Sequence, residues 1–464
     1  MNMKRGDYMN EYEKFIESKI QVFESVGFDI DREKLNSMLF DFQKDIVRWA
    51  LKKGRAAIFA DCGMGKTAMQ LEWANQIYKK EGGKILILAP LAVASQTKRE
   101  GEKFNISVNI CESQEDVIDG INITNYEKLD KFIAKEFNAI VLDESSILKS
   151  FTGKVRTQII DSFKNTPYRL ACTATPAPND YMELGNHSQF LGIMTREEML
   201  SMYFVHDGGQ TSKWRLKGHA EESFWEWMAS WSVFIDNPKN LGYEIEGYEL
   251  PKLNIFEIVA DGEEITTDKL TLTQRREARK ESLDIRCEKA AELVNNSNEN
   301  WLVWCDLNDE SKKLHELINN SVEVKGSDKN NFKSKSMLDF SENKIKCLVT
   351  KPKIAGFGMN WQNCRNMIFV GLSDSYEAYY QAMRRCWRFG QEKEVNVYII
   401  ISSKEGAVKE NIERKQADAE KMKNAMIKLT KDITKKELRQ TTRITTPYDP
   451  QIDMIIPDWL VEQI

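Results

Sequence analysis

The chain has 464 residues, of which 41% are hydrophobic and 30% charged, and its formal net charge is −5. This length fits two or three domains, and the hydrophobic fraction is sufficient for globular cores. The net charge excludes a surface that is basic throughout, so any nucleic-acid site must be a local basic region.

Cysteine usage and hydropathy indicate the compartment. The 8 cysteines are scattered and form no Cys-x-x-Cys pair, which argues against a zinc ribbon or a disulfide framework. No apolar run is long enough for a transmembrane helix, and the polar segment from Met1 to Tyr12 is unlike a signal peptide. We therefore expect a cytoplasmic protein with reduced thiols and no membrane contact.

The first part of the chain predicts an α/β domain. Residues 1–38 are charged and predict a helical extension. After them, short apolar runs alternate with helical segments such as Thr67 to Lys80. The runs that predict strands are Ala56 to Ala60, Lys84 to Ala89, Asn138 to Leu142 and Tyr168 to Ala171. This alternation is typical of a parallel sheet covered by helices, a RecA-like domain over residues 39–194.

The second part repeats the pattern after an interruption. Residues 195–282 are rich in tryptophan and predict a helical insert that bridges two α/β domains. A second RecA-like domain is expected over residues 283–404, and residues 405–464 predict a charged C-terminal helical extension. The runs that predict strands of the second domain are Trp301 to Cys305, Cys347 to Thr350, Met367 to Val370 and Val395 to Ile401.

A glycine-rich loop from Ala60 to Thr67 lies between an expected strand and an expected helix, the context that a phosphate-binding loop requires. Backbone N–H groups around Gly63 and Gly65, together with the helix N-terminus, would hold the phosphates. Lys66 would reach the β- and γ-phosphates, and the Thr67 hydroxyl would bind Mg²⁺. The alternative is a strand-to-helix turn with an exposed lysine.

Two acidic residues, Asp143 and Glu144, directly follow an apolar strand. A carboxylate at this end of a strand points into the crevice where such sheets bind ligands. We expect Asp143 to hold Mg²⁺ and Glu144 to activate the attacking water. Considered alone, the pair would be a solvated turn, but its position after the phosphate-binding loop favours the catalytic interpretation.

Two further segments have weaker signals. The hydroxyl residues Thr173 and Thr175 precede Pro176 and could relay changes between the acidic pair and the substrate surface, although a plain turn closed by Pro176 is favoured when the segment is considered alone. Gln43 lies about 20 residues before the phosphate-binding loop, and its amide could recognise an adenine edge. The alternative is a residue on a helix surface.

A late segment, Gln381 to Gln391, contains two arginines three residues apart. On a helix, Arg385 and Arg388 would share one face and could reach the γ-phosphate of a nucleotide bound to the other domain. The alternative is a solvated basic helix face. The phosphate-binding loop and this segment together predict an ATP-driven machine that closes one domain on another.

The ordered set of motifs resembles superfamily-two helicases, and among them the Swi/Snf-like translocases of double-stranded DNA. The resemblance covers about residues 39–404. In the first half the matching runs are Phe42-Gln43, Ala60 to Thr67, Ala89 to Leu91, Ile123 to Glu127, Asp143-Glu144 with Lys149-Ser150, Thr173 to Pro176 and Asn179 to Leu184. In the second half they are Lys353 to Trp361, Gln381 to Gln391 and Glu394 to Tyr398.

The resemblance implies roles by position. Arg385 and Arg388 match arginine fingers, and Gln381 matches a residue near the γ-phosphate. Gly358 falls in a segment that couples nucleotide to DNA and is expected to contribute to the nucleotide site. Contacts with the phosphate backbone of DNA, which carry no sequence information, are implied for Pro90, Leu91, Thr124, Asn125, Thr350 and Asn360.

Two positions depart from the family pattern. Ser145-Ser146 and Cys386-Trp387 both stand where relatives have Ala-His, so the family's coupling histidines are absent. The tryptophan-rich insert resembles that of compact bacteriophage and prophage members, with the host cytoplasm and replication or recombination proteins as expected surroundings. Packing against a motor domain is the expected role of its tryptophans, and base stacking is the alternative.

The sequence thus predicts an ATP- and Mg²⁺-dependent translocase or helicase acting on double-stranded DNA in replication, recombination or repair. One alternative is a helicase dependent on RNA or on single strands. An alternative of another class is a regulatory clamp that binds nucleotide and a protein partner with little turnover.

Overall fold

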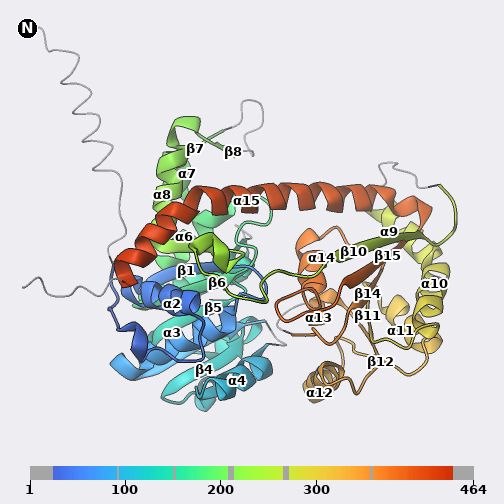
Figure 1. The fold of residues 1–464 in the computed structure, drawn as a ribbon, viewed down its shortest axis with the longest axis horizontal. Helices are drawn as coiled ribbons and strands as arrows, with labels where there is room; N and C mark the ends of the chain where they lie inside the picture. The colour runs from blue at the N-terminus through green and yellow to red at the C-terminus, as the bar shows by residue number, and fades with distance from the viewer. Residues whose placement is uncertain are drawn as a thin grey trace, which may run out of the picture.

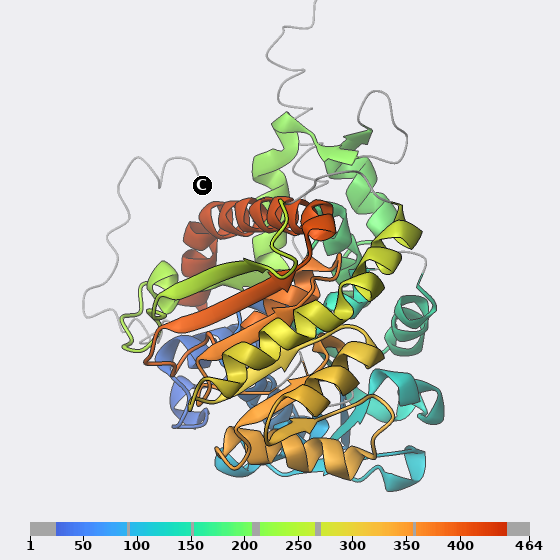
Figure 2. The same cartoon turned by 90° about the vertical axis from the view of Figure 1, so that its right-hand side faces the viewer.

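The computed structural model describes residues 25–90, 93–149, 153–206, 214–264, 271–355 and 359–442. Two fully parallel sheets lie beside one another, and helices cover both faces of each (Figure 1). This arrangement is the tandem RecA-like fold that the alternating sequence pattern predicts. Figure 2 shows the second sheet with its covering helices turned toward the viewer.

The first sheet has seven strands in the order β3-β4-β2-β5-β6-β1-β9. Alternate residues of its strands face two separate cores: Ile58 packs with α2 and α3, whereas Phe59 packs with α5 to α8. Burial on both faces explains the continuous apolar runs in the sequence. The strands are β1 (Arg55–Ala60), β2 (Lys84–Ala89), β3 (Val108–Ile110), β4 (Gly120–Asn125), β5 (Phe137–Asp143), β6 (Tyr168–Thr173) and β9 (Ser232–Ile235).

Seven helices accompany this sheet. They are α2 (Asp41–Lys53), α3 (Lys66–Glu81), α4 (Ala94–Lys103), α5 (Lys154–Phe163), α6 (Leu184–Leu191), α7 (Arg196–Tyr203) and α8 (Glu221–Trp231). The helical extension expected over residues 1–38 falls mostly outside the described residues, and the described part before α2 contains only the short 3-10 helix η1 (Arg32–Lys34).

The second sheet has six strands in the order β10-β15-β14-β11-β13-β12. They are β10 (Leu253–Val259), β11 (Trp301–Trp304), β12 (Ser321–Glu323), β13 (Cys347–Thr350), β14 (Asn366–Val370) and β15 (Val395–Ile401). Its helices are α9 (Leu272–Glu281), α10 (Leu283–Asn295), α11 (Asn308–Leu317), α12 (Asn330–Ser341), α13 (Pro352–Ala355) and α14 (Tyr376–Met383). Val303 packs on the face with α10 and α11, and Leu302 packs on the face with α12 and α14.

The expected insert contributes strands to both sheets. β9 pairs in parallel with β1, and β10 pairs in parallel with β15. Between them, α8 buries Trp225, Trp227 and Trp231 against the first domain, where Trp231 lies edge-to-face with Phe59. Packing is therefore the role of these three tryptophans, and their burial leaves none of them exposed for base stacking. A small hairpin of β7 (Phe204–His206) and β8 (Trp214–Leu216) projects beyond α7.

The long helix α15 (Gly406–Thr442) starts beside the second domain and runs back across the first (Figure 1). Its side chains enter three cores: Val408 and Ile412 pack in the second domain, Met426 packs beside α8, and Leu438 packs beside α2. The charged C-terminal segment is thus a strap that both domains bury along one side.

Candidate nucleotide and nucleic-acid sites

Three neighbouring strands bring the first-domain motifs together. β5, β6 and β1 are adjacent in the sheet, and all three run in the same direction. Their carboxyl ends lead into Asp143-Glu144, into Thr173 and into the phosphate-binding loop. Segments far apart in the sequence therefore meet at one edge, as expected for ligand sites in parallel sheets.

The loop between β1 and α3 requires its glycines. Gly63 and Gly65 have φ angles of 90° and 81°, a region that other residues rarely adopt. A Cβ on Gly65 would lie 2.2 Å from Nε2 of Gln43, and one on Gly63 would lie 3.0 Å from the Phe389 backbone nitrogen of the second domain. Lys66 begins α3, and its Nζ donates to the Ala60 carbonyl at 2.9 Å.

A cavity of about 340 Å³ lies at this edge and joins the two domains. The first domain contributes predicted residues from the loop and the acidic pair, and the second contributes both arginines. Predicted residues that line it are Gln43, Gly63, Gly65, Lys66, Thr67, Asp143, Glu144, Asn360, Arg385 and Arg388. The structure thus brings most of the predicted nucleotide site into one cavity.

The acidic pair is held by buried polar groups. Gln70 Nε2 donates to Asp143 Oδ1 at 2.8 Å, and the Tyr126 hydroxyl donates to the Asp143 carbonyl at 2.7 Å. Burial, with the Glu144 charge beside it, raises the pKa of Asp143 to about 6. Glu144 adopts a left-handed φ of 53°, and its Oε2 accepts a hydrogen bond from the Thr173 hydroxyl at 3.2 Å. Such backbone strain in a non-glycine residue is concentrated at functional sites.

Arg385 and Arg388 lie in the turn after α14, because that helix ends at Met383. The expected shared helix face is therefore wrong, yet the turn still directs both side chains to one place. Nη1 of each guanidinium donates to the Met359 carbonyl, at 3.1 Å from Arg385 and 3.2 Å from Arg388.

The two guanidinium groups form a concentrated positive site. Within the described residues, neither is in an ion pair with an aspartate or glutamate, and Nε of Arg388 is buried without a hydrogen-bond partner. Burial, together with the Arg385 charge, lowers the pKa of Arg388 to about 10. Two guanidinium groups that line one cavity and have no ion-pair partner among the described residues fit an anionic ligand.

Gln381 lies behind this pair. It is fully buried on α14, and its Oε1 accepts from Nη2 of Arg385 at 3.1 Å and from the Cys62 thiol at 3.9 Å. It does not line the nucleotide cavity. Its contacts with Arg385 and Cys62 are those of a residue that orients Arg385 against the phosphate-binding loop.

Gln43 and three aromatic residues form the outer side of the cavity. Gln43 accepts from the Phe40 backbone N–H and donates to the Met64 carbonyl, each at 3.0 Å. Phe40, Tyr248 and Phe389 surround the same opening, and the rings of Tyr248 and Phe389 lie 4.5 Å apart. This aromatic cluster forms a flat apolar surface suited to a nucleobase. It was not predicted from the sequence, because its members are distant along the chain.

The residues present fit a magnesium nucleotide. The glycine loop and the two arginines match a polyphosphate, and the Thr67 hydroxyl with the Asp143 carboxylate supplies hard oxygen ligands. No cluster of three or more His, Cys, Asp or Glu side chains with metal-binding geometry occurs among the described residues.

A second cavity, of about 480 Å³, also lies between the domains. Pro90, Thr124 and Asn125 line its first-domain side, as predicted for nucleic-acid contacts. Basic residues face it from both domains: Arg99, Lys128, Lys333 and Lys353. We call this cavity the basic groove. Its small polar and basic groups suit phosphate oxygens, and the lining also contains Glu112, which pairs with Lys128, and apolar side chains.

Two predicted nucleic-acid contacts lie elsewhere. Thr350 is fully buried and donates its hydroxyl to the Val324 carbonyl at 3.1 Å, so its side chain does not reach the basic groove. Asn360 lines the nucleotide cavity rather than the groove. Leu91 and Gly358 lie outside the described residues.

The sequence analysis also missed a buried charge cluster at the phosphate-binding loop. Asp61 accepts hydrogen bonds from the Tyr380 hydroxyl at 2.8 Å and from Nζ of Lys423 at 2.7 Å, and Nη2 of Arg384 lies 3.7 Å away. The three partners come from the second domain and from α15. Lys423 is 362 positions from Asp61, so no local pattern could have revealed the contact.

Two further findings concern the cysteines and the helices. All 8 cysteines are free thiols, and all are buried. None of the helices in the described ranges has the length and apolar character needed to span a membrane.

Comparisons with known proteins identify both halves. Residues 26–178 match the family model described as "Type III restriction enzyme, res subunit", and residues 286–390 match "Helicase conserved C-terminal domain". A solved structure, the SWI2/SNF2 ATPase core of Sulfolobus solfataricus in complex with dsDNA, is similar with 17% identity and a TM-score of 0.42. The match covers 90% of this chain and 99% of that one. No curated protein matches significantly.

The two family models together span more than half of the chain, in the order expected for a two-domain helicase. Both domains are thus similar to helicase-related families, and the chain is a nucleic-acid-dependent ATPase.

Proposed function

We propose that this protein is a Swi/Snf-like translocase that hydrolyses ATP and moves along double-stranded DNA. The observation that carries the proposal is the shared cavity in which Arg385 and Arg388 of the second domain face Lys66 and Glu144 of the first. The catalytic site around a nucleotide bound there would be complete only when the two domains are close together.

Each side of the nucleotide cavity would supply a different part of the reaction. Bound Mg²⁺ would neutralise phosphate charge, and Thr67 and Asp143 would be its protein ligands. Glu144 would orient and deprotonate the attacking water, and Lys66 would bind the phosphates. Arg385 and Arg388 would stabilise the charge that develops in the transition state, because their guanidinium groups line the cavity and are already oriented by the Met359 carbonyl.

The basic groove supports a nucleic-acid substrate that is held by its phosphates. Thr124 and Asn125 on one domain face Lys333 and Lys353 on the other, so closing the domains would shift one set of contacts relative to the other. Binding through phosphates is independent of sequence and weakens as salt rises. The preference for duplex DNA rests on the ordered Swi/Snf-like motifs, and a phage replication or recombination role rests on the resemblance of the insert.

The test is ATPase activity with duplex DNA, single-stranded DNA and RNA at equal nucleotide concentration. We expect duplex DNA to stimulate most, with stimulation that falls between 50 and 200 mM salt. A triplex-displacement assay would then detect movement along the duplex. Strongest stimulation by RNA or by single strands would replace the proposal with that alternative.

The same assay separates the enzyme from a regulatory clamp. Glu144→Gln should bind ATP normally and hydrolyse it at least about 100-fold more slowly, because the amide cannot accept a proton from water. Turnover that is low in the unaltered protein with every nucleic acid, and unchanged in the variant, would favour the clamp.

A further inference from the structure

The carboxylate of Glu377 connects the second domain to the first. Glu377 lies on α14 and is 9% exposed. Its Oε1 accepts a hydrogen bond from the Thr175 hydroxyl at 3.2 Å, and its Oε2 accepts one from Nζ of Lys149. Thr175 and Lys149 both belong to the first domain, so one side chain bridges the boundary with two polar contacts.

The bridge continues to the water-activating residue. The Thr175 backbone N–H donates to the Thr173 hydroxyl at 3.1 Å, and that hydroxyl donates to Oε2 of Glu144 at 3.2 Å. Thr173 is completely buried, so water does not compete for these bonds. Three hydrogen bonds, together with the covalent link between the hydroxyl and the backbone nitrogen of Thr175, therefore join Glu377 to Glu144.

The residues at the family's coupling positions do not make this connection. Ser145 contacts His187 of its own domain, with Oγ and Nε2 3.1 Å apart, and burial lowers the pKa of His187 to about 4. Cys386 is buried in the core of the second domain, and Trp387 donates its Nε1 to the Pro251 carbonyl at 2.7 Å. None of these contacts links Glu144 to the second domain.

Glu377 also faces the path to the basic groove. It lines a cavity of about 480 Å³ together with Lys149, Lys353 and Lys415. Lys353 lines both this cavity and the basic groove, so the two adjoin at that lysine. A phosphate that approached Lys149 would compete with Glu377 for its charge. The carboxylate is thus placed between the nucleic-acid surface and the hydrolytic residue.

We propose that Glu377 is a positioning residue that transmits domain closure on nucleic acid to Glu144 through Thr175 and Thr173. It takes the place of the coupling histidines that this chain lacks. The inference rests on the proposed function, since it concerns how nucleic acid raises the rate of hydrolysis. Glu377 does not line the nucleotide cavity, and acts by holding the threonine pair that orients the Glu144 carboxylate.

The test compares Glu377→Ala and Thr175→Val with Thr175→Ser, in the full chain with saturating duplex DNA. The alanine and valine variants should lose about tenfold in the DNA-stimulated kcat, while KM for ATP stays within twofold. Thr175→Ser keeps the hydroxyl and should restore most of the stimulation. A double variant, Thr175→Val with Glu377→Ala, should be no worse than either single variant, because both break one connection.

Glu316→Gln, which alters an exposed glutamate on α11, is the matched control and should behave like the unaltered protein. Normal stimulation of Glu377→Ala, or equal losses in Thr175→Ser and Thr175→Val, would overturn the inference. If the unaltered protein responds to no nucleic acid, the proposed function fails instead. Nucleotide affinity and urea denaturation of each variant identify any that fail to fold.

Discussion

Arg385 and Arg388 show at the scale of single residues how a site is prepared for its ligand. Arg385 is buried and Arg388 is half-buried, and each donates one hydrogen bond to the Met359 carbonyl, while Arg385 also donates to Gln381. Burial without an acidic partner costs free energy, as the lowered pKa of Arg388 indicates. The arrangement favours catalysis, because a cationic group that is already desolvated and oriented stabilises transition-state charge without further reorganisation.

Removal of one of these charges should therefore lower the rate of ATP hydrolysis without lowering the stability of the fold. We expect Arg388→Met to lower the stimulated kcat by about 10³-fold, the magnitude that arginine fingers usually supply. The same variant should unfold at an equal or higher urea concentration than the unaltered protein, because a partly buried unpaired charge is lost. Steady-state kinetics and urea denaturation measure the two effects. Loss of activity that is accompanied by marked destabilisation would mean that Arg388 is a structural residue.

At the scale of elements, sequence patterns predicted most of the strands that are buried on both faces, but they did not predict the buried inner strand β4. The expected bounds Lys84 to Ala89 and Cys347 to Thr350 agree with β2 and β13. β9 and β10 are edge strands of the two sheets, and both were missed because they lie in the segment that was expected to be a helical insert.

The candidate site followed the same rule. Residues next to a strand or in a local motif were found, because spacing along the chain determines their position. The aromatic cluster at the cavity and the Asp61 contacts were not found, because tertiary packing brings them together from distant segments. The turn after α14 was also unforeseen, since helical spacing continues past Met383 in the sequence.

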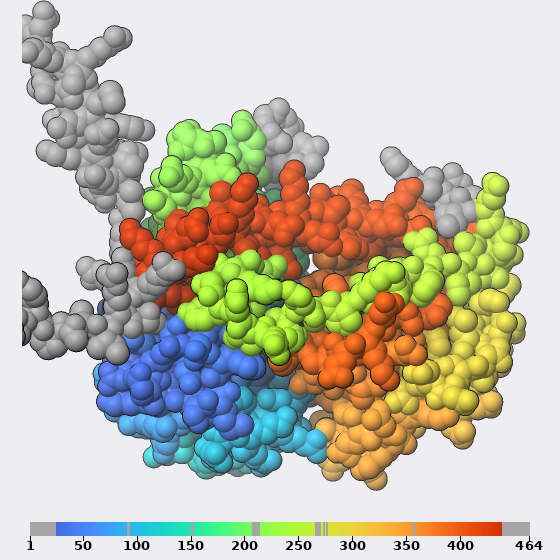
Figure 3. Space-filling model, viewed as in Figure 1, coloured from blue at the N-terminus to red at the C-terminus, as the bar shows by residue number. Residues whose placement is uncertain are grey.

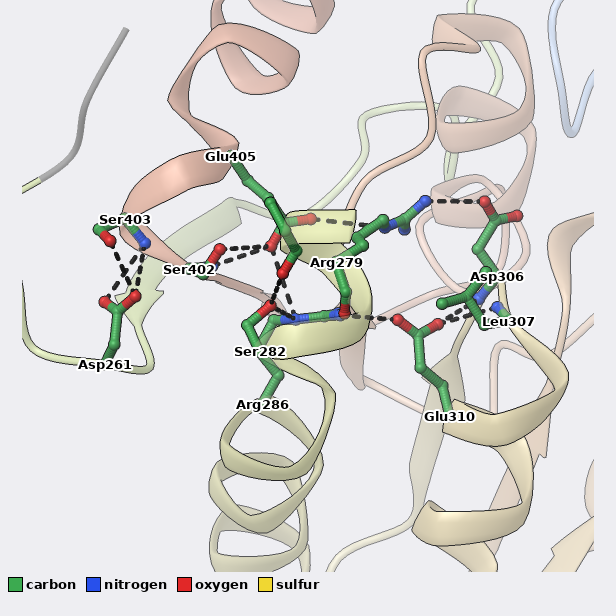
Figure 4. A network of polar contacts seen from close by, with 11 residues as sticks. Asp261, Arg279, Ser282, Arg286, Asp306, Leu307, Glu310, Ser402, Ser403 and Glu405 are labelled. Atoms are coloured by element: carbon green, nitrogen blue, oxygen red, sulfur yellow. Dashed lines mark hydrogen bonds and ion pairs between the residues drawn. The ribbon is translucent and has the colours of Figure 1, made fainter. Parts of the chain in front are cut away.

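The start of α15 is fixed by a buried ionic network, shown in Figure 4. Arg286 lies 2.9 Å from Glu310 through Nη2 and Oε1, and both are fully buried. Glu405, one residue before α15, lies 3.4 Å from Arg279 and 3.5 Å from Arg286. Glu310 also accepts hydrogen bonds from the backbone N–H groups of Asp306 and Leu307, the two residues that precede α11. The network thus joins the strap to α9, α10 and α11.

Breaking this network on one side should destabilise the second domain. Arg286→Ala leaves Glu310 as a buried unpaired charge, so we expect a loss of about 3–5 kcal/mol in its free energy of unfolding. The double variant Arg286→Met with Glu310→Leu should recover much of that loss. Arg365→Ala, which breaks an exposed pair with Glu299, is the control and should cost about 0–1 kcal/mol. Urea denaturation, followed at the unfolding transition of the second domain, measures the free energy of unfolding of all three variants. Equal losses for Arg286→Ala and Arg365→Ala would show that the network does not stabilise this domain.

At the scale of the whole molecule, the strap and the second domain both hold the phosphate-binding loop. Figure 3 shows α15 lying continuously over the two halves. Asp61 on the loop is bound by Tyr380 and Arg384 from the second domain and by Lys423 from α15. Lys423 also lies 3.4 Å from Asp236, which follows β9. A movement that separates the domains must break or shift these contacts, so the nucleotide loop is mechanically connected to domain position.

The ionisation of this cluster sets the pH range in which it acts. The Arg384 and Lys423 charges outweigh burial and lower the pKa of Asp61, so its contribution is complete above the unfolded value near 4 and is lost only at lower pH. The Asp61 and Asp236 charges outweigh burial and raise the pKa of Lys423, so its contribution is complete below the unfolded value near 10.5 and is lost only above it. The contact is therefore constant between pH 6 and 9.

Loss of the strap's charge should open the molecule. We expect Lys423→Met to increase the open fraction about tenfold, as measured by energy transfer between fluorophores on the two domains without nucleotide. That change corresponds to about 1.4 kcal/mol, a modest value because Lys423 is partly exposed and Arg384 remains near Asp61. Lys421→Met, two residues away on the exposed side of α15, is the control and should leave energy transfer unchanged. The opening should be the same at pH 6 and pH 9, and unchanged energy transfer in Lys423→Met would show that packing alone holds the domains together.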